Sequence, residues 1–127
     1  MRRGCLLFAL LLLASCAAIE PTGRRFVVFF EPSSAELEET ATSVVVAAAD
    51  WARLRPGMDV SVSSYADTYG SAQANADFTR LRAQAVFDVL VRNGIPATRI
   101  QRREVGAVAF QIDAQESRRV VVVVGSP

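Results

Sequence analysis

Apolar residues recur along this chain with two different periods, and stretches of the two kinds alternate. Short runs rich in valine, phenylalanine and isoleucine predict buried β-strands. Longer stretches in which apolar residues return every three or four positions predict amphipathic helices. The expected strands cover residues 26–30, 58–63, 99–105 and 120–124, and the expected helices cover residues 35–55 and 74–92. The last strand contains five consecutive valines, which is typical of a central strand covered on both faces.

Turn-forming residues separate these elements. Ser34 is expected to cap the first helix, and three glutamates then fall in its first turns, where they suit the helix dipole. Pro56-Gly57 ends that helix, and Asn93-Gly94 ends the second. Residues 106–117 are expected to form a loop before the last strand. The order strand, helix, strand, helix, strand, loop, strand predicts an α/β sandwich with two helices packed on one sheet.

The first fifteen residues have the pattern of a secretory signal peptide. Arg2 and Arg3 precede a short apolar run, and small residues follow it. The run is too short to cross a bilayer as a helix, which needs about 20 residues; an uncut amino-terminal anchor is the alternative. We therefore expect residues 1–15 to be the signal, residues 16–25 a tether, and residues 26–127 one folded domain.

The end of the signal, Leu13-Ala14-Ser15-Cys16, resembles the bacterial lipoprotein signature. In that family the cysteine is acylated, palmitate included, and becomes the first residue of the mature chain; the alternative is a Cys16 that happens to follow an ordinary signal. The resemblance implies a lipid anchor on Cys16, and Ala17 rather than Asp at the next position implies the outer membrane. The ten steps from Cys16 to Phe26 reach at most roughly 33–36 Å, so the domain would work close to its membrane.

Composition excludes several kinds of function. The chain has 14 arginines, no lysine and no histidine against 13 acids; without Arg2 and Arg3 the balance is 12 to 13, or −1, which does not suggest a nucleic-acid partner. Without histidine, lysine or a free thiol there is no Ser-His, Cys-His or Ser-Lys nucleophile. Metals would have to bind carboxylates alone, which is rare, and we expect no cofactor. A glycoside-cleaving carboxylate pair is a weak alternative that composition leaves open, with four available acids: Glu31, Glu36, Asp67 and Asp77.

The stretch from residue 65 to residue 83, YADTYGSAQANADFTRLRA, is too polar to serve only as core. Asp67 directly follows the second expected strand, where strand ends open to ligands in α/β sheets, and Arg82 lies on the next helix. A carboxylate and a guanidinium facing one cleft suit a zwitterion: Asp67 would accept from an ammonium, and Arg82 would hold a carboxylate with two hydrogen bonds. The alternatives are a turn or helix cap for Asp67 and a surface ion pair for Arg82.

The same stretch resembles the signature of the OmpA-like C-terminal domain, the peptidoglycan-associating module of outer-membrane lipoproteins. The matching residues are Tyr65-Ala66-Asp67, Gly70, Asn75, Phe78-Thr79 and Arg82-Ala83, without gaps. Outside the stretch, Phe29-Phe30-Glu31 resembles the end of the family's first strand, and Ser117-Arg118-Arg119-Val120 resembles its closing motif. The likeness runs from about Phe26 to Val124 and implies the β-α-β-α-β-β fold, with two helices on one mixed sheet.

The resemblance also implies a ligand, the diaminopimelate of the peptidoglycan stem peptide, whose side chain is a zwitterion. Carried over by position, Asp67 would bind the ammonium and Arg82 the carboxylate. Phe78 would form an apolar wall with Thr79 beside it, Asn75 would order the loop, and Arg119 would lie at the rim. The expected protein is then a non-catalytic lipoprotein of the outer membrane that faces the periplasm and binds peptidoglycan, with envelope proteins as further possible partners.

Four departures from the family pattern affect this expectation. Ser64 stands where a glycine usually opens the turn, Glu31 replaces an aspartate, Ser117 replaces an asparagine, and Gly106 is followed by Ala107 rather than Glu. A periplasmic protein-interaction module of the same fold, with a degenerate glycan site, is therefore the main alternative. A motor-stator relative is disfavoured, because those proteins carry an uncut membrane span in place of Cys16.

Overall fold

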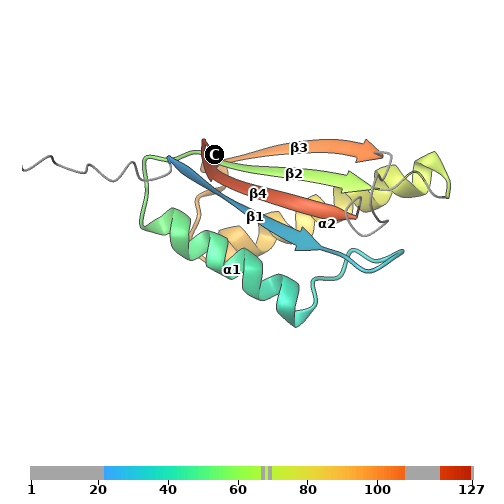
Figure 1. The fold of residues 1–127 in the computed structure, drawn as a ribbon, viewed down its shortest axis with the longest axis horizontal. Helices are drawn as coiled ribbons and strands as arrows, with labels where there is room; N and C mark the ends of the chain where they lie inside the picture. The colour runs from blue at the N-terminus through green and yellow to red at the C-terminus, as the bar shows by residue number, and fades with distance from the viewer. Residues whose placement is uncertain (1–21, 67, 69, 108–117, 127) are drawn as a thin grey trace, which may run out of the picture.

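Four strands form one sheet, and two helices cover one of its faces (Figure 1). A computed structural model describes residues 22–66, 68, 70–107 and 118–126, and every structural statement below refers to these residues. The strands are β1 (Gly23–Phe29), β2 (Val60–Ala66), β3 (Ile100–Ala107) and β4 (Arg119–Gly125), and the helices are α1 (Glu39–Arg53) and α2 (Ala72–Arg92), with a short 3₁₀ turn, η1 (Ala97–Arg99), before β3. This is the predicted sandwich of two helices on one mixed sheet.

The sheet has the order β1-β4-β2-β3, so the last strand of the chain lies between the first and the second. β4 runs antiparallel to both β1 and β2, whereas β3 runs parallel to β2. β1, β2 and β3 therefore all point the same way, and their carboxyl ends meet at one end of the sheet. We call this the site end; the opposite end, where β1 begins and β4 finishes, is the tether end (Figure 1).

The core lies between the sheet and the helices. Alternate residues of β1, β2 and β4 face the helices, for example Val28, Val62 and Val122, and each is at most 1% exposed. α1 packs on β1 and β4 and buries four alanines and Val45, and these small side chains let the helix lie close to the sheet. α2 packs on β2 and β3. On the face of β4 without helices, Val121 is also buried but Val123 only half-buried, so the predicted burial on both faces holds only in part.

The start of the first helix was predicted wrongly. α1 begins at Glu39, and its N-cap is Glu38, which makes no side-chain cap hydrogen bond. The Ser34 hydroxyl instead accepts from the backbone N–H of Glu36 at 3.0 Å, within an extended connection. A serine can satisfy a nearby backbone donor in a turn as well as at a helix start, and sequence does not separate the two.

The second helix begins slightly earlier than predicted. Its N-cap is Ser71, whose Oγ accepts from the Ala74 N–H at 3.0 Å, and its first residue is Ala72. Arg82 therefore lies in the third turn of α2. It is still on the face that the helix turns toward the sheet, because Arg82 is buried.

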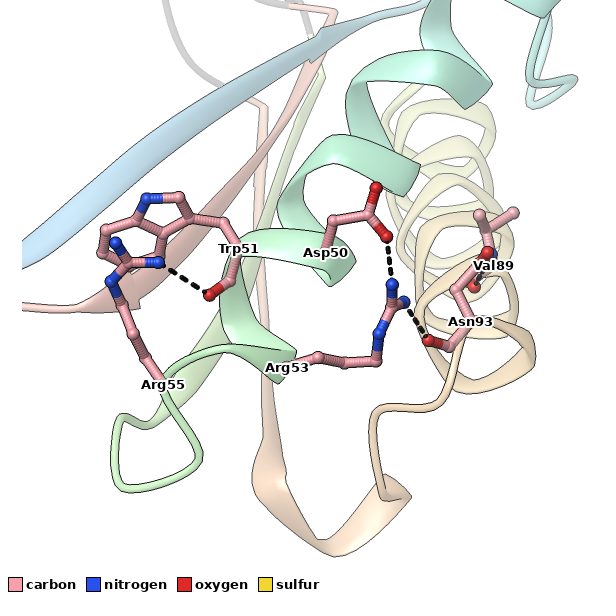
Figure 2. Close-up of polar contacts among 6 residues, drawn as sticks. All are labelled: Asp50, Trp51, Arg53, Arg55, Val89 and Asn93. Atoms are coloured by element: carbon pink, nitrogen blue, oxygen red, sulfur yellow. Dashed lines mark hydrogen bonds and ion pairs between the residues drawn. The ribbon is translucent and has the colours of Figure 1, made fainter.

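Arginines fasten the helix ends at the tether end (Figure 2). Arg53, the last residue of α1, donates from Nη1 to the Asn93 carbonyl just past α2 at 2.6 Å and from Nη2 to Asp50. Arg55 lies over the Trp51 ring, with Cζ 3.7 Å from its centre, and donates to the Trp51 carbonyl at 3.2 Å. Helix carboxyl ends leave carbonyls without intrahelical partners, and cations near them are favourable. Guanidinium groups satisfy that requirement here.

Candidate functional site

The candidate site is built at the site end of the sheet from the end of β1, the connection to α1, the end of β2 and the first three turns of α2. These segments meet there because β1 and β2 point the same way and α2 follows β2 after a short turn. The polar stretch from residue 65 to residue 83 forms much of it. Asn75, Thr79 and Arg82 recur at helical spacing on α2 and are all buried.

Arg82 is the central side chain of the site, and only 2% of it is exposed. Its Nε donates to the Ser34 carbonyl at 2.8 Å, and its Nη2 donates to the Glu31 carbonyl at 3.2 Å. These two carbonyls bracket the turn at Pro32 and Ser33, so the guanidinium ties both sides of the turn to α2. Ser33 has φ 52°, in the left-handed region that costs a non-glycine residue roughly 1–2 kcal/mol. Arg82 therefore holds an intrinsically unfavourable turn in place.

Two aromatic rings lie against the same guanidinium. Cζ of Arg82 is 5.3 Å from the centre of the Phe30 ring and 5.1 Å from that of Phe78. A cation this close to aromatic faces is favourable, and more so when water is excluded. The alternative that Arg82 forms a surface ion pair is therefore wrong. Its charge is buried and lies against fixed carbonyl and aromatic partners.

Asn75 and Thr79 support the helix beside Arg82. The Thr79 hydroxyl donates to the Asn75 carbonyl one turn earlier at 2.8 Å, and these residues are 2% and 9% exposed. Phe78, between them on the helix, is half-buried and so reaches the surface of the site. The structure thus brings together four of the predicted residues: Asn75, Phe78, Thr79 and Arg82.

Arg119 lies at the same end of the sheet but not beside Arg82. It alternates with the helix-facing valines of β4, and Tyr65 alternates with the helix-facing residues of β2, so both lie on the face without helices. Cζ of Arg119 is 4.2 Å from the centre of the Tyr65 ring. A ligand that touched both Arg82 and Arg119 would have to extend around the end of the sheet. A rim position for Arg119 remains a prediction.

Asp67, the predicted ammonium ligand, lies outside the described residues, as do Cys16 and Ser117. β2 ends at Ala66, so Asp67 does follow the strand directly in the chain, as expected.

Ser64, at the position where the family usually has glycine, is fully buried on the helix-facing side of β2. Its Oγ has no hydrogen-bond partner among the residues described. A register shift between β2 and β3 follows it, at Ser64/Tyr65. The departure therefore buries a hydroxyl on the helix-facing side of β2 without ending the strand.

Sequence reasoning missed the groups that hold Arg82. The carbonyls of Glu31 and Ser34 are backbone groups that every residue has, so the residue types at these positions do not predict their role. Phe30 stood in a recognised motif but was not expected in the site. A bulky aromatic directly before the first connection was the available signal, since a buried guanidinium needs a flat partner.

The described part of the chain shows neither a metal-binding cluster nor a membrane-spanning helix. It contains no group of three or more acidic, cysteine or histidine residues placed to hold a metal ion. Neither described helix has the length and apolar character that a membrane crossing requires.

Comparison with known proteins agrees with this fold. The model of the OmpA family matches residues 29–121, which is most of the chain. The chain belongs to the OmpA family. The match includes both helices, β2, β3 and the Arg82 stretch, so it covers the whole site described above.

Curated relatives point the same way. A peptidoglycan-associated lipoprotein of Agrobacterium fabrum is 29% identical over 104 residues, which are 77% of this chain and 59% of that protein. A protein of the same name from Rhizobium meliloti is 28% identical over the same coverage. The chain thus spans about three fifths of the length of these relatives.

Solved structures share the fold at low identity. The peptidoglycan-associated lipoprotein of Burkholderia pseudomallei has a TM-score of 0.70 at 20% identity, covering 78% of this chain and 89% of that one. The periplasmic domain of Helicobacter pylori MotB has a TM-score of 0.67 at 15% identity, covering 83% and 75%. The two-helix, four-strand sandwich is therefore the OmpA-like fold.

Proposed function

We propose that this chain is a non-catalytic outer-membrane lipoprotein that binds the diaminopimelate-containing stem peptide of peptidoglycan and links the envelope layers. The observation that carries the proposal is Arg82, a desolvated guanidinium held by two carbonyls and two aromatic rings at the strand ends. The names of the curated relatives, both peptidoglycan-associated lipoproteins, support the same ligand class.

In the proposed complex Arg82 binds the carboxylate at the side-chain end of diaminopimelate. Two of its five N–H donors go to Ser34 and Glu31, which fixes the plane of the guanidinium before the ligand arrives. Because Arg82 is 2% exposed, the carboxylate must displace whatever covers it. Phe78 is the aromatic wall that lies against the guanidinium and also reaches the surface, so its rotation would open the way.

Asp67 binds the ammonium of the same zwitterion in this proposal. Asn75 orders the turn that precedes α2, and Thr79 keeps the helix face regular by its hydrogen bond to Asn75. A zwitterion held at both charges is distinguished from a plain amine or a plain acid, because either would leave one desolvated group unpaired. This accounts for selectivity without any chemical step.

The other attachment is the proposed acyl group on Cys16, after removal of residues 1–15. Residues 16–25 would tether the domain, residues 26–127, to the outer membrane on its periplasmic side. Two attachments on one chain raise the effective concentration of each contact, so even weak binding to the cell wall would link the layers. Labelling with palmitate should mark wild-type chain and not Cys16→Ser, and an unlabelled wild type would contradict the anchor.

Co-sedimentation of the mature chain with purified sacculi tests the ligand. Asp67→Asn should lose binding, and free diaminopimelate should compete for the wild type; breaking one half of a desolvated charge pair costs about 2–5 kcal/mol, or at least 30-fold in affinity. The matched control is Asp77→Asn, an exposed acid on the first turns of α2 that contacts Gln73 and Arg80. Equal binding by both variants would remove Asp67 from the site.

The same experiment separates the alternative function. A chain that fails to sediment with bare sacculi but is retained by envelope extracts would be a protein-interaction module of the OmpA-like fold. Release of soluble muropeptides during incubation would instead reveal a glycan-cleaving activity. Either result would replace the proposal above.

A further inference from the structure

The tether end of the domain has a charge and shape of its own, separate from the peptidoglycan site. It consists of residues 22–25, 50–59, 88–99 and 125–126. Paired backbones join these segments: Gly23 lies opposite Gly125 in the β1–β4 ladder, and the Gly125 N–H donates to the Asp59 carbonyl at 2.8 Å. With the Arg53 contact to Asn93 described above, these pairings bring the four segments together at the end of the sheet opposite to the carboxyl ends of β1, β2 and β3 (Figure 1).

This surface carries an excess of positive charge. Its charged residues are six arginines and three aspartates: Arg24, Arg25, Arg53, Arg55, Arg92, Arg99, Asp50, Asp59 and Asp88. Among all described residues the other charges balance, with six arginines and six acids. The net +3 of the described part of the domain thus resides at the tether end. Arg24, Arg25 and Arg92 are exposed, and no ion pair joins them to any described carboxylate.

An apolar side chain projects from the same surface. Leu54, directly after α1, is 79% exposed, the highest value among the exposed large apolar residues of the described chain; the next highest is 44%. Val91, near the end of α2, is 38% exposed. Single exposed leucines are common on protein surfaces, so the exposure of Leu54 alone would not indicate a binding surface. What distinguishes it is that it lies at the same end of the domain as Arg24, Arg25 and Arg92, which form no ion pair with a described carboxylate.

Two other arginines of this surface, Arg53 and Arg99, hold its turns in place through hydrogen bonds to backbone carbonyls. Arg99 donates from Nε to the Met58 carbonyl at 2.7 Å and from Nη2 to the Arg55 carbonyl at 2.6 Å. Arg53 ties the end of α1 to the end of α2, as Figure 2 shows. The turn that presents Leu54 is therefore fixed from both sides, and its shape does not have to form on binding.

We propose that the tether end docks on a phospholipid surface that carries anionic headgroups, with Arg24, Arg25 and Arg92 at the headgroups and Leu54 at the acyl boundary. Charge complementarity and chain direction support this occupant. The chain enters the domain here, at Gly23, a few residues after Cys16, so the proposed lipid anchor brings this end nearest the membrane. The part of this inference that places the tether end at the membrane rests on that proposed anchor.

Docking would set the orientation of the peptidoglycan site. Each strand has seven or eight residues, or about 23–26 Å from one end of the sheet to the other. With the tether end on the membrane, the site end faces away from it, toward the cell wall. A freely rotating domain on a short tether would present the site in all directions, so docking would favour productive encounters.

Vesicle binding tests the proposal without the acyl group. The probe is the chain of residues 16–127 carrying Cys16→Ser, mixed with vesicles of 30% phosphatidylglycerol in phosphatidylcholine or with pure phosphatidylcholine, at low salt. A basic residue near an anionic surface contributes a factor of about five in binding. Arg24→Gln with Arg25→Gln should therefore weaken binding to the anionic vesicles about 25-fold, and Leu54→Ser about tenfold.

The matched control removes two arginines elsewhere, Arg80→Gln with Arg103→Gln, both exposed and outside the tether end. It should bind the anionic vesicles nearly as wild type does. Trp51 gives a second measurement, because it is the only tryptophan and lies three residues before Leu54. Brominated anionic lipids should quench its fluorescence in wild type and much less in the Arg24, Arg25 variant.

Three results would overturn the proposal. The first is a wild type that does not bind anionic vesicles at low salt. The second is a control pair that weakens binding as much as the Arg24, Arg25 pair does. The third is binding of soluble polyglutamate as strong as that of vesicles, with no effect of Leu54→Ser, which would indicate an acidic protein partner. The two proposals fail separately: loss of vesicle binding with intact sacculus binding would remove only the docking surface.

Discussion

The Arg82 guanidinium has one structural role and one proposed binding role. It is the proposed carboxylate ligand, and it also ties the Pro32–Ser33 turn to α2 through the Glu31 and Ser34 carbonyls. If the guanidinium is removed, these two carbonyls lose their hydrogen-bond donor. Stability and binding at this residue therefore cannot be changed independently, which makes Asp67 the cleaner position for testing the ligand alone.

Arg82→Lys should lower both stability and binding. Lysine keeps the charge but loses the planar fork that reaches two carbonyls and contacts two rings. We expect the free energy of unfolding to fall by about 2 kcal/mol, measured by urea denaturation with Trp51 fluorescence, and sacculus binding to fall as well. Arg80→Lys is the control, since Arg80 is exposed and its ion pair among the described residues, with Asp77, is also exposed, and it should change stability by less than about 0.5 kcal/mol. An unchanged urea midpoint for Arg82→Lys would contradict the fastening role.

Ser64→Ala should leave stability unchanged or raise it by about 1 kcal/mol. The reason is that the buried Ser64 hydroxyl has no partner among the described residues, so alanine removes an unsatisfied polar atom at little cost in packing. Ser64→Gly should be less stable than Ser64→Ala by about 0.5–1 kcal/mol, because glycine loses more conformational freedom on folding. Urea midpoints of the three proteins check this order. A fall of more than about 1 kcal/mol in Ser64→Ala would show instead that the hydroxyl has a partner beyond the described residues.

Secondary elements were largely predictable because their signals are local. The five valines predicted the strand that became β4, and the apolar spacing predicted α1 and α2. Ser34 misplaced the start of α1, since its hydroxyl accepts from the Glu36 N–H in the connection before the helix and its carbonyl accepts from Arg82 on α2. Pairing order was not predictable in the same way: β4 lies between β1 and β2 because of long-range packing that no short segment records.

The sequence predicted the side chains of the site but not the backbone groups that contact them. Arg82 was expected from its place on the helix after β2 and from the family resemblance, and Asn75, Phe78 and Thr79 from the resemblance alone; the structure brings these four together. The resemblance also placed Arg119 at the rim of the site, whereas strand alternation puts it on the face of the sheet without helices. The carbonyl partners of Arg82 carry no residue signature, so they emerge only from the fold.

Arg99 plays the same part at the tether end as Arg82 does at the site end: each donates to two backbone carbonyls of a turn. It bridges the Arg55 and Met58 carbonyls and so joins the turn after α1 to η1. Arg99→Gln should lower the free energy of unfolding by about 2 kcal/mol, because two charged hydrogen bonds to backbone are lost. Arg103→Gln, an exposed arginine on β3, should change it by less than about 0.5 kcal/mol. Equal urea midpoints for the two variants would show that the turn is held by packing alone.

The whole molecule separates two surfaces by the length of its strands. One end holds the buried Arg82 guanidinium, the proposed ligand of a zwitterion, and the other presents arginines and Leu54 on the side where the chain enters. The helices lie on one face of the sheet, and the two surfaces lie at its opposite ends (Figure 1). Binding at the site end should therefore stabilise the fold without requiring any change at the tether end.

Free diaminopimelate should raise the melting temperature of the mature chain. A ligand that binds only the folded state at ten times its Kd adds about 1.4 kcal/mol. For a domain of about 100 residues that corresponds to about 5–10 °C. Scanning calorimetry with rising diaminopimelate measures the shift, which should be absent in Asp67→Asn and intact in Asp77→Asn. The Arg24→Gln, Arg25→Gln variant should show the full shift, because its changes lie at the other end of the sheet. A shift that survives in Asp67→Asn would place the ligand away from the strand ends, and one lost in the Arg24, Arg25 variant would mean that the two ends are coupled.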